Sequence, residues 1–287
     1  METKLRQLYL DIVRKTILGM TYRDPSLNAS NGTQVQYNHD AREAGEDWPI
    51  LAHSMAGNKR MLNIQTLADQ VIANNILGDF VETGVWRGGS CIFMAAILKS
   101  YGITDRKIWA CDSFAGLPQP DEAYPADKGD THYLAPFLSV SLEQVKENFA
   151  GYDLLTDQVH FVKGWFSNSL PNLPVKKIAI LRLDGDMYES TIDALTNLYA
   201  KVSVGGYVIV DDYGLPNCRA ALADYRAYYD ITDEYIAIDN SSVFWQKTAE
   251  LPEKPPVTFK QEVKPKMATA PTMQYAKSNI TSLSSLD

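Results

Sequence analysis

The 287-residue sequence has few cysteines and no long hydrophobic run, and each absence excludes a class of protein. Its three cysteines, Cys91, Cys111 and Cys218, stand too far apart for a disulfide framework or a zinc-binding spacing, so we expect them to be buried apolar side chains. No stretch approaches the ~18 apolar residues of a membrane span, and segment 1–20 lacks the apolar core of a signal peptide. We therefore expect a cytoplasmic protein without a membrane partner.

Excess basic charge is also lacking. The 27 basic residues are dispersed among 35 acidic ones, which gives a net charge of −8 and a pI near 5.1. Because a nucleic-acid interface needs concentrated positive charge, no nucleic-acid partner is expected. The hydrophobic content of 45% is that of an ordinary globular core. This composition favours small-molecule chemistry.

From residue 79 onward, short apolar runs alternate with amphipathic segments. The pattern predicts strands at 79–84, 107–113, 158–164, 176–184 and 206–212, helices at 89–102, 141–152, 188–202 and 217–229, and a hairpin at 234–238 and 242–247. Strands that alternate with helices imply a doubly wound sheet with helices on both faces. We predict an α/β, Rossmann-like fold whose sheet is mostly parallel and ends in an antiparallel hairpin strand.

The flanking regions have different patterns. Residues 1–57 begin with an amphipathic helix at 2–19 and continue into a polar stretch, 21–49, which is either a lid or a floppy surface segment. The predicted apolar face of that first helix comprises Leu5, Leu8, Ile12, Val13, Thr16 and Ile17. A second helix, 58–77, opens the main domain at 58–247, and Gly78 is expected to cap it. Residues 248–287 lack periodicity and read as a disordered tail or linker.

Ligands of such sheets bind at the carboxyl ends of the strands, where this sequence places polar and glycine-rich loops. In ETGVWRGGS (82–90), Glu82 precedes glycines that lead into a helix whose free N–H groups can bind an anion. Asp112, after the next strand, can accept both hydroxyls of a ribose while Phe114 packs on a purine; alternatively it caps the following turn. Because the first loop lacks G-x-G-x-x-G spacing, a nucleotide-dependent oxidoreductase is disfavoured.

Nucleoside recognition without a phosphate-binding motif points to S-adenosylmethionine. The ammonium group of this compound needs an oxygen partner, which Glu82 or the backbone around Gly84 can supply. After the third strand, Gly164 permits close approach and Trp165 can cover an adenine, the alternative being a core tryptophan at a strand end.

Three aspartates follow the two most apolar runs of the sequence. Asp184 ends IAILRL (178–183), while Asp211 and Asp212 follow YVIV (207–210). Neighbouring strand ends would bring these carboxylates together, and their repulsion would raise their pKa values unless a cation neutralised it. Oxygen ligands favour Mg²⁺, with Mn²⁺ or Ca²⁺ as alternatives.

A bound Mg²⁺ would acidify and orient a substrate hydroxyl. Asp184 could then bind the metal and also accept the hydroxyl proton. His132 is a second candidate base, although a solvated loop histidine is the simpler interpretation. Asp186 is expected to cap the helix that begins near Tyr188.

Five motifs in this order resemble the macrocin-type O-methyltransferases. They are ETGVWRGGS (82–90), DSFAGLP (112–118), KGWF (163–166), LRLDGDMYEST (181–191) and GGYVIVDDYG (205–214). The resemblance, over roughly residues 51–247, implies an S-adenosylmethionine- and Mg²⁺-dependent enzyme that methylates sugar hydroxyls of macrolide or aminocoumarin antibiotics. It also implies metal ligands at Asp184, Asp211 and Asp212, with Asp184 as general base.

The same resemblance implies the cofactor-binding positions and the assembly. The positions are Ser54 and Met55, Glu82, Thr83, Gly84, Val85, Trp86 and Ser90, and Asp112, Ser113, Phe114, Ala115 and Gly116. Family members have N-terminal lids and tend to form oligomers, so a mobile 21–49 segment and a homodimer or higher homo-oligomer are expected. The part of the chain after Lys247 is longer than such enzymes need and could connect to a neighbouring synthase.

The acceptor is expected to be a small hydroxylated secondary metabolite, with a sugar hydroxyl of a glycoside as the first choice. A catechol-type enzyme with a phenolic acceptor is the alternative with the same cofactor and metal. A non-catalytic methyltransferase-fold module of a synthase is a third hypothesis. The tail supports that third hypothesis, and the retention of all three metal carboxylates speaks against it.

Overall fold

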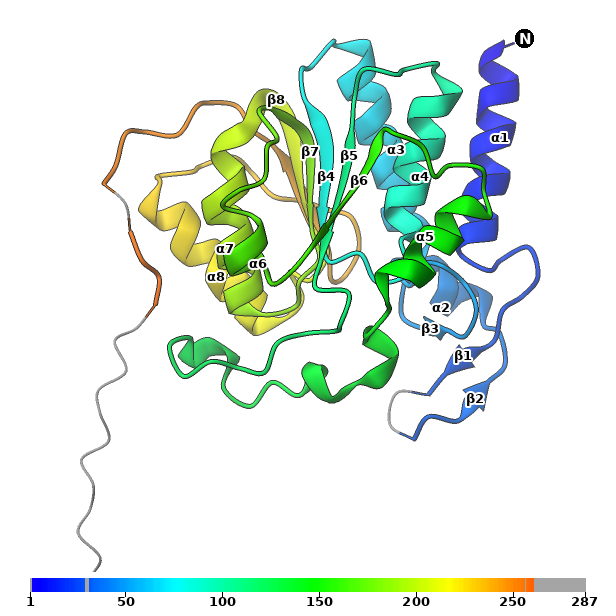
Figure 1. Ribbon diagram of the computed structural model, residues 1–287, viewed down its shortest axis with the longest axis horizontal. Coiled ribbons are helices and arrows are strands. Elements are labelled where there is room, and N and C mark those ends of the chain that lie inside the picture. Colours follow the sequence, from blue (N-terminus) through cyan, green and yellow to red (C-terminus); the bar gives the residue numbers. More distant parts are fainter. Residues whose placement is uncertain (1, 29–30, 256, 261–287) are drawn as a thin grey trace, which may run out of the picture.

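The computed structural model describes residues 2–28, 31–255 and 257–260. These residues form a seven-stranded sheet of order β6-β5-β4-β7-β8-β10-β9 at the centre of Figure 1. Its strands are β4 (Asp79–Thr83), β5 (Ile108–Asp112), β6 (Val159–Lys163), β7 (Ile178–Leu183), β8 (Val202–Val210), β9 (Ile236–Ala237) and β10 (Val243–Gln246). Neighbours among β4 to β8 pair in parallel, whereas β10 pairs antiparallel with β8 and β9. The predicted α/β, Rossmann-like fold with its C-terminal hairpin is confirmed.

Helices cover both faces of the sheet (Figure 1). On one side lie α1 (Glu2–Ile17), α3 (Gly57–Ala73), α4 (Gly89–Ser100) and α5 (Leu142–Ala150); on the other lie α6 (Phe166–Ser169), α7 (Tyr188–Leu198) and α8 (Pro216–Tyr228). Successive strand residues enter opposite cores, as Phe80 and Val81 do in β4. Every residue of β7 is buried, because helices cover both of its sides.

The carboxyl ends of β4, β5, β7 and β8 meet at one edge of the sheet. The segment between β5 and α5 crosses below this edge in Figure 1 and contains the short turns η1 (Pro125–Asp127), η2 (His132–Leu134) and η3 (Pro136–Leu138). The parallel strands therefore direct their terminal side chains toward a space that this crossing segment borders.

The first helix turns a different face to the core from the one predicted. Val13 and Ile17 are buried together with Leu10, but Leu5, Leu8 and Ile12 are more than half exposed. The helix packs against α4, and the apolar residues on the side that faces α4 contribute to the core. The prediction is wrong for the outer residues because periodicity does not say which of two apolar stripes meets a partner.

The described residues of the polar stretch after α1 form a layer of short strands and one helix. It contains the strands β1 (Ser26–Leu27), β2 (Gln34–Val35) and β3 (Trp48–Pro49) and the helix α2 (His39–Ala44), none of which the sequence predicted. At its centre is Arg42, whose side chain is fully buried. The Arg42 guanidinium pairs with Asp47 and donates to the carbonyl oxygens of Leu18 and Asp24. One buried cation thus organises a segment that has little apolar core.

Two further expectations differ from the structure. Helix α3 ends at Ala73 with Asn74 as its cap, so Gly78 does not close it. Gly78 has a φ of 125° and lies so close to β7 that a Cβ would come 2.7 Å from the backbone of Ile178.

The described residues beyond Lys247 also differ from the expected tail. Leu251 and Phe259 pack on the core around α8, and the Tyr228 hydroxyl donates to the Pro255 carbonyl oxygen at 2.7 Å. Residues 248–255 and 257–260 therefore form a C-terminal strap over α8. The expectation of a tail or synthase linker for 261–287 falls outside the described residues. Among the residues that the structure describes, no helix has the length and apolarity needed to cross a membrane.

Arg42→Ala should destabilise the N-terminal layer. Removing one partner of a buried ion pair typically costs about 3–5 kcal/mol, because the carboxylate and carbonyl groups left behind lose their donor. Urea unfolding should show this loss, and hydrogen exchange should place the largest increase within residues 21–56. Arg23→Ala, at an exposed position of the same layer, is the control; equal effects of the two substitutions would contradict the role of Arg42.

Candidate active site

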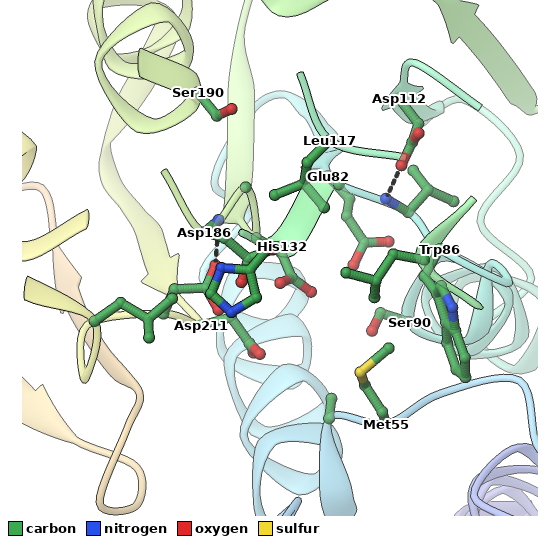
Figure 2. Close-up of a pocket in the computed structure, with 18 of the residues that line it drawn as sticks. Met55, Glu82, Trp86, Ser90, Asp112, Leu117, His132, Asp186, Ser190 and Asp211 are labelled. Atoms are coloured by element: carbon green, nitrogen blue, oxygen red, sulfur yellow. Dashed lines mark hydrogen bonds between the residues drawn. The ribbon is translucent and has the colours of Figure 1, made fainter. Parts of the chain in front are cut away.

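A pocket of about 650 Å³ lies at the carboxyl edge of the sheet. Figure 2 shows two groups of lining side chains on opposite sides of it, with Glu82 between them. Met55, Trp86, Ser90 and Asp112 lie on one side, and His132, Asp186 and Asp211 lie on the other. The first group comes from the loops predicted to bind a cofactor, and the second surrounds the predicted metal ligands.

The loop after β4 passes close to the end of β7. Gly84 has a φ of 88°, and a Cβ there would lie 1.5 Å from the carbonyl oxygen of Asp184, so this position requires glycine. Gly89 similarly contacts the segment before α3: its N–H donates to the His53 carbonyl oxygen at 2.9 Å. That contact places Ser54 and Met55 on the start of α4, where both line the pocket.

Asp112 connects the two glycine-containing loops that follow β4 and β5. Its carboxylate accepts the backbone N–H groups of Val85 and Phe114, each at 2.6 Å. Burial raises the pKa of Asp112, and these N–H donors oppose the shift. A carboxylate oxygen has two acceptor sites, so Asp112 combines the structural role of a turn cap with capacity for a ligand hydroxyl.

The pocket contains most of the predicted cofactor positions. Lining residues among them are Ser54, Met55, Glu82, Gly84, Val85, Trp86, Ser90, Asp112, Ser113, Gly116, Gly164 and Trp165. Thr83, Phe114 and Ala115 do not line it: Thr83 is buried, Ala115 is exposed outside the pocket, and Phe114 packs edge-on against Phe161 in the core. The predicted stacking of Phe114 on a purine is therefore absent from this arrangement of the described residues.

Glu82 has less freedom than the sequence suggested. It is 1% exposed, and its two oxygens pair with the Arg182 guanidinium and accept from Cys91 Sγ. The Gly84 N–H donates to the Cys111 carbonyl oxygen, and within the described part of the chain the Gly84 carbonyl oxygen accepts no hydrogen bond. Of the two predicted partners for an ammonium group, the geometry favours the backbone around Gly84.

The three predicted metal ligands come together as expected. Asp184, Asp211 and Asp212 each offer a carboxylate oxygen, and these oxygens lie within 4.8 Å of one another. Asp184 follows β7 and the Asp211–Asp212 pair follows β8, so the adjacency of the two strands produces the cluster. Carboxylate oxygens at such separations are suitable for a hard divalent cation.

Two arginines supply part of the positive charge that offsets the repulsion among the three aspartates. Arg182, in β7 and 1% exposed, donates to Glu82, Asp184 and Asp211, and Arg60 of α3 donates to Asp211 at 2.6 Å. The sequence analysis named a bound metal cation as the neutralising charge and did not consider either arginine. Arg182 stood inside the quoted LRLDGD motif, and an arginine in an otherwise apolar strand was a signal of a buried counter-charge.

The carboxylates titrate differently because the arginines reach only some of them. Burial opposes ionisation of Asp211, but Arg182 and Arg60 outweigh it and lower the pKa of its carboxyl. Burial raises the pKa of Asp184 to about 8, with Arg182 opposing and the nearby carboxylates adding to the shift. Burial and the charges of Asp186 and Asp184 raise the pKa of Asp212 well above its usual range. A cation at the cluster would therefore favour ionisation mainly of Asp184 and Asp212, whose pKa values are raised.

Asp186 does not cap α7, contrary to the prediction. Met187 occupies the N-cap position without a side-chain hydrogen bond. The N–H groups of Tyr188 and Glu189 donate instead to Asp127, at 2.7 and 2.9 Å. Asp186 lines the pocket in a left-handed conformation, φ 58°, with its own N–H donated to the Asp212 carboxylate. Because Asp127 is far from α7 in the sequence, no local pattern at the start of this helix indicated that it is the cap.

Comparisons with known proteins agree with this geometry. The family description "Macrocin-O-methyltransferase (TylF)" matches residues 6–247. The chain belongs to the macrocin O-methyltransferase family. Demethyldecarbamoylnovobiocin O-methyltransferase of Streptomyces niveus is 50% identical over 245 residues, 84% of this chain and 94% of that protein.

Two further similarities support the assignment. The 8-demethyl-8-(2,3-dimethoxy-alpha-L-rhamnosyl)-tetracenomycin-C 4'-O-methyltransferase of Streptomyces olivaceus is 46% identical over 246 residues, 85% of this chain and 94% of that protein. The solved structure of the O-methyltransferase NovP is similar with a TM-score of 0.82 and 48% identity, over 85% of this chain and 100% of that one. Membership of the family makes the chain an O-methyltransferase, and S-adenosylmethionine is the methyl donor expected for that class.

The far side of this O-methyltransferase pocket is acidic as well, which the sequence analysis did not anticipate. Glu189 and Asp193, one helical turn apart on α7, both line it. Burial and the neighbouring charges of Asp193 and Asp121 raise the pKa of Glu189 to about 7. Burial raises the pKa of Asp193 to about 6, with Lys260 of the C-terminal strap opposing.

Glu189→Gln should stabilise the O-methyltransferase above neutral pH. A glutamate in an unfolded chain titrates near ~4.3, so between that pH and about 7 the folded state binds more protons and loses stability as pH rises. The variant lacks this loss; it should exceed the parent in unfolding free energy at pH 8 and match it at pH 4. Urea unfolding across pH measures the difference, and Glu147→Gln on the exposed face of α5 should show none. A Glu189→Gln advantage that is independent of pH would contradict the assignment.

Proposed function

We propose that this O-methyltransferase transfers a methyl group from S-adenosylmethionine to a sugar hydroxyl of a glycosylated secondary metabolite, with Mg²⁺ at the aspartate cluster. The observation that carries the proposal is the single pocket in which the cofactor loops and the carboxylate cluster face each other. Because both groups line one pocket, a methyl donor bound at the cofactor loops would lie close to a hydroxyl bound at the carboxylate cluster.

The cofactor half has suitable partners for each part of S-adenosylmethionine. Asp112 is positioned to accept ribose hydroxyls, and the free N–H groups at the start of α4, near Ser90, suit the methionine carboxylate. The carbonyl of Gly84 is an acceptor for the ammonium group. Trp165, which is 40% exposed at the pocket wall, can cover the adenine, and Met55 can close over the donor from the N-terminal side.

The carboxylate half fits Mg²⁺. The oxygens of Asp184, Asp211 and Asp212 lie within 4.8 Å of one another, and two of the three have raised pKa values that a dication would relieve. Bound there, Mg²⁺ would lower the pKa of a hydroxyl and hold its oxygen. Mn²⁺ or Ca²⁺ could occupy the same oxygen ligands. The assignment of the hydroxyl proton to Asp184 stays a prediction.

The names of the relatives support a sugar hydroxyl as the acceptor. One relative acts on a rhamnosyl-tetracenomycin and another on demethyldecarbamoylnovobiocin. The acidic wall around Glu189 and Asp193 offers hydrogen-bond acceptors that hydroxyl-rich sugars can use. These observations favour a glycoside over a catechol.

The expected homo-oligomer and cytoplasmic location stay predictions. The exposed stripe of Leu5, Leu8 and Ile12 on α1 is an apolar surface that a second copy could cover. A sedimentation measurement of molecular mass would decide between a monomer and a homodimer or larger assembly.

Metal removal should abolish methyl transfer. Excess EDTA should eliminate activity and Mg²⁺ should restore it, because the acidification of the hydroxyl depends on the cation. Asp184→Asn should fold normally yet lose most activity and weaken Mn²⁺ binding measured by electron paramagnetic resonance. Asp121→Asn, a carboxylate of the pocket wall outside the cluster, should keep metal affinity. Undiminished activity in excess EDTA would exclude the metal from the mechanism.

An acceptor panel tests the substrate class. Methyl transfer from S-adenosylmethionine should be detected with demethyldecarbamoylnovobiocin or a rhamnosyl-tetracenomycin and be at least tenfold slower with a vicinal diphenol. Mass spectrometry of the products locates the added methyl group. Transfer to the diphenol alone would replace the sugar with a phenolic acceptor.

A further inference from the structure

The turn between β9 and β10, residues 238–242, belongs to a part of the pocket wall that the proposed function leaves without a role. Strand β10 runs antiparallel to β8, and Val243 at its start pairs with Val210 at the end of β8. This pairing puts the turn at the carboxyl edge of the sheet, beside the loop that carries Asp211 and Asp212. The cofactor loops follow β4 and β5, which lie on the other side of β7 in the strand order. The turn therefore borders the carboxylate half of the pocket.

Hydrogen bonds shape this turn and attach it to the loop after β8. Asp239 Oδ1 accepts the backbone N–H groups of Ser241 and Ser242, each at 2.8 Å. The Ser242 hydroxyl donates to the Asp211 carbonyl oxygen at 2.6 Å, and the Gly214 N–H donates to the Ser241 carbonyl oxygen at 2.8 Å. The turn thus has a defined conformation on the loop that carries two of the clustered aspartates.

Arg60 of α3 joins the turn to the carboxylate cluster. Its Nε donates to Asp239 Oδ2 at 2.7 Å, and its Nη1 donates to Asp211 Oδ2 at 2.6 Å. The side chains of Asp239 and Asp211 are only 5% and 6% exposed, so each depends on a partner for its charge. Because a guanidinium is planar and rigid, bonds from two of its nitrogens fix the separation of the two carboxylates. Arg60 therefore sets the position of the turn relative to the cluster.

Asn240 is the side chain that the turn presents to the pocket. It is exposed and lines the pocket, whereas its neighbours Asp239 and Ser241 are partly buried. Within the described part of the chain, the Asn240 amide makes no hydrogen bond. An amide has two N–H donors and an acceptor oxygen, so it can bind neighbouring hydroxyls of a sugar ring.

The geometry of methyl transfer directs the acceptor toward this turn. The attacking oxygen must lie in line with the sulfur–methyl bond, on the side of the methyl group away from the sulfur. With the cofactor at the loops after β4 and β5 and the hydroxyl at the cluster, the rest of the acceptor extends to the β8 side. The pocket walls there include the turn and the Glu189 and Asp193 side chains of α7.

We propose that the turn at 238–242 is the outer wall of the acceptor subsite, that Asn240 binds a sugar hydroxyl there, and that Arg60 is the positioning residue of the turn. The inference rests on the proposed function, because it takes the acceptor to be a glycoside. Asn240 is then a specificity-determining residue, and Arg60 acts on acceptor binding through Asp239.

Asn240→Ala tests the contact with the acceptor. With demethyldecarbamoylnovobiocin as the probe and saturating S-adenosylmethionine and Mg²⁺, KM for the probe should rise by about five- to tenfold, the effect of one lost hydrogen bond. The fall in kcat should be smaller. Calorimetry with the probe and S-adenosylhomocysteine should show the same loss of affinity without turnover. Asn172→Ala, at an exposed asparagine outside the pocket, is the matched control and should bind the probe as the parent does.

Asp239→Asn tests the bridge and spares the turn. The asparagine oxygen can still accept the two N–H groups of the turn, but its NH₂ group faces the Arg60 Nε–H, so two donors meet. KM for the probe should rise, and hydrogen exchange should increase within residues 236–243. Mn²⁺ affinity, measured by electron paramagnetic resonance, should stay at the parental value because Arg60 still pairs with Asp211. A general loss of stability would not raise KM selectively in this way.

A double-mutant cycle tests whether Arg60 acts through Asp239. Arg60→Lys keeps one positive charge but loses the fork that reaches both carboxylates, so KM for the probe should rise as in Asp239→Asn. The double variant should have about the same KM as Arg60→Lys alone, since the bridge can be lost only once. Additive effects would contradict the role of Arg60 in positioning the turn.

The outcomes separate this inference from the proposed function. If the parent methylates the probe and Asn240→Ala keeps its KM and affinity within about twofold of the parent, the inference fails and the proposed function stands. If the parent methylates a vicinal diphenol alone, the sugar acceptor fails; the inferred sugar contact of Asn240 fails with it. A parent that methylates neither compound refutes both.

Discussion

The Arg182 guanidinium holds the site together. Arg182 is buried in the central strand β7. Its guanidinium donates to Glu82, Asp184 and Asp211, which lie at the carboxyl ends of three neighbouring strands. Without that charge the ends of β4, β7 and β8 would present unpaired anions to one another at low dielectric. Because Arg182 and Arg60 supply partial compensation from within the chain, the fold can assemble its acidic cluster before any cation arrives.

Because the two arginines reach the three aspartates unequally, the aspartates differ in their pKa values. Asp211 faces both arginines, which lower the pKa of its carboxyl, whereas the raised pKa values of Asp184 and Asp212 mean that these two carboxyls favour the protonated form until a cation binds. The uneven neutralisation creates an affinity for a dication at a defined place and keeps the other acidic residues of the pocket available for hydrogen bonding. A symmetric cluster with one arginine per carboxylate would have no such preference.

The sequence predicted the sheet, its strand-end loops and the three clustered aspartates, because continuous apolar runs and period-3.6 helices are local signals. It did not predict Arg60, whose partners Asp211 and Asp239 lie more than 150 residues away. The role of Asp127 was not predicted for the same reason, because it caps α7 from η1, which is distant in the sequence. The order of the layer around Arg42 was missed because buried ion pairs, unlike apolar stripes, leave no periodic trace. Phe114, predicted to pack on a purine, lies buried in the core beside Phe161, a long-range contact that no local pattern indicates.

The C-terminal strap has a consequence for how the molecule can be shortened. Phe259 packs against the rings of Tyr225 and Tyr228 on α8, Leu251 packs against the same core, and Lys254 donates to Asp230 just after that helix. The same strap carries Lys260 toward the acidic wall at Asp193. A chain shortened to the end of β10 would therefore expose the outer surface of α8 and lose the positive charge of Lys260 near Asp193. The packed structure extends past residues 6–247, the part that the family description matches.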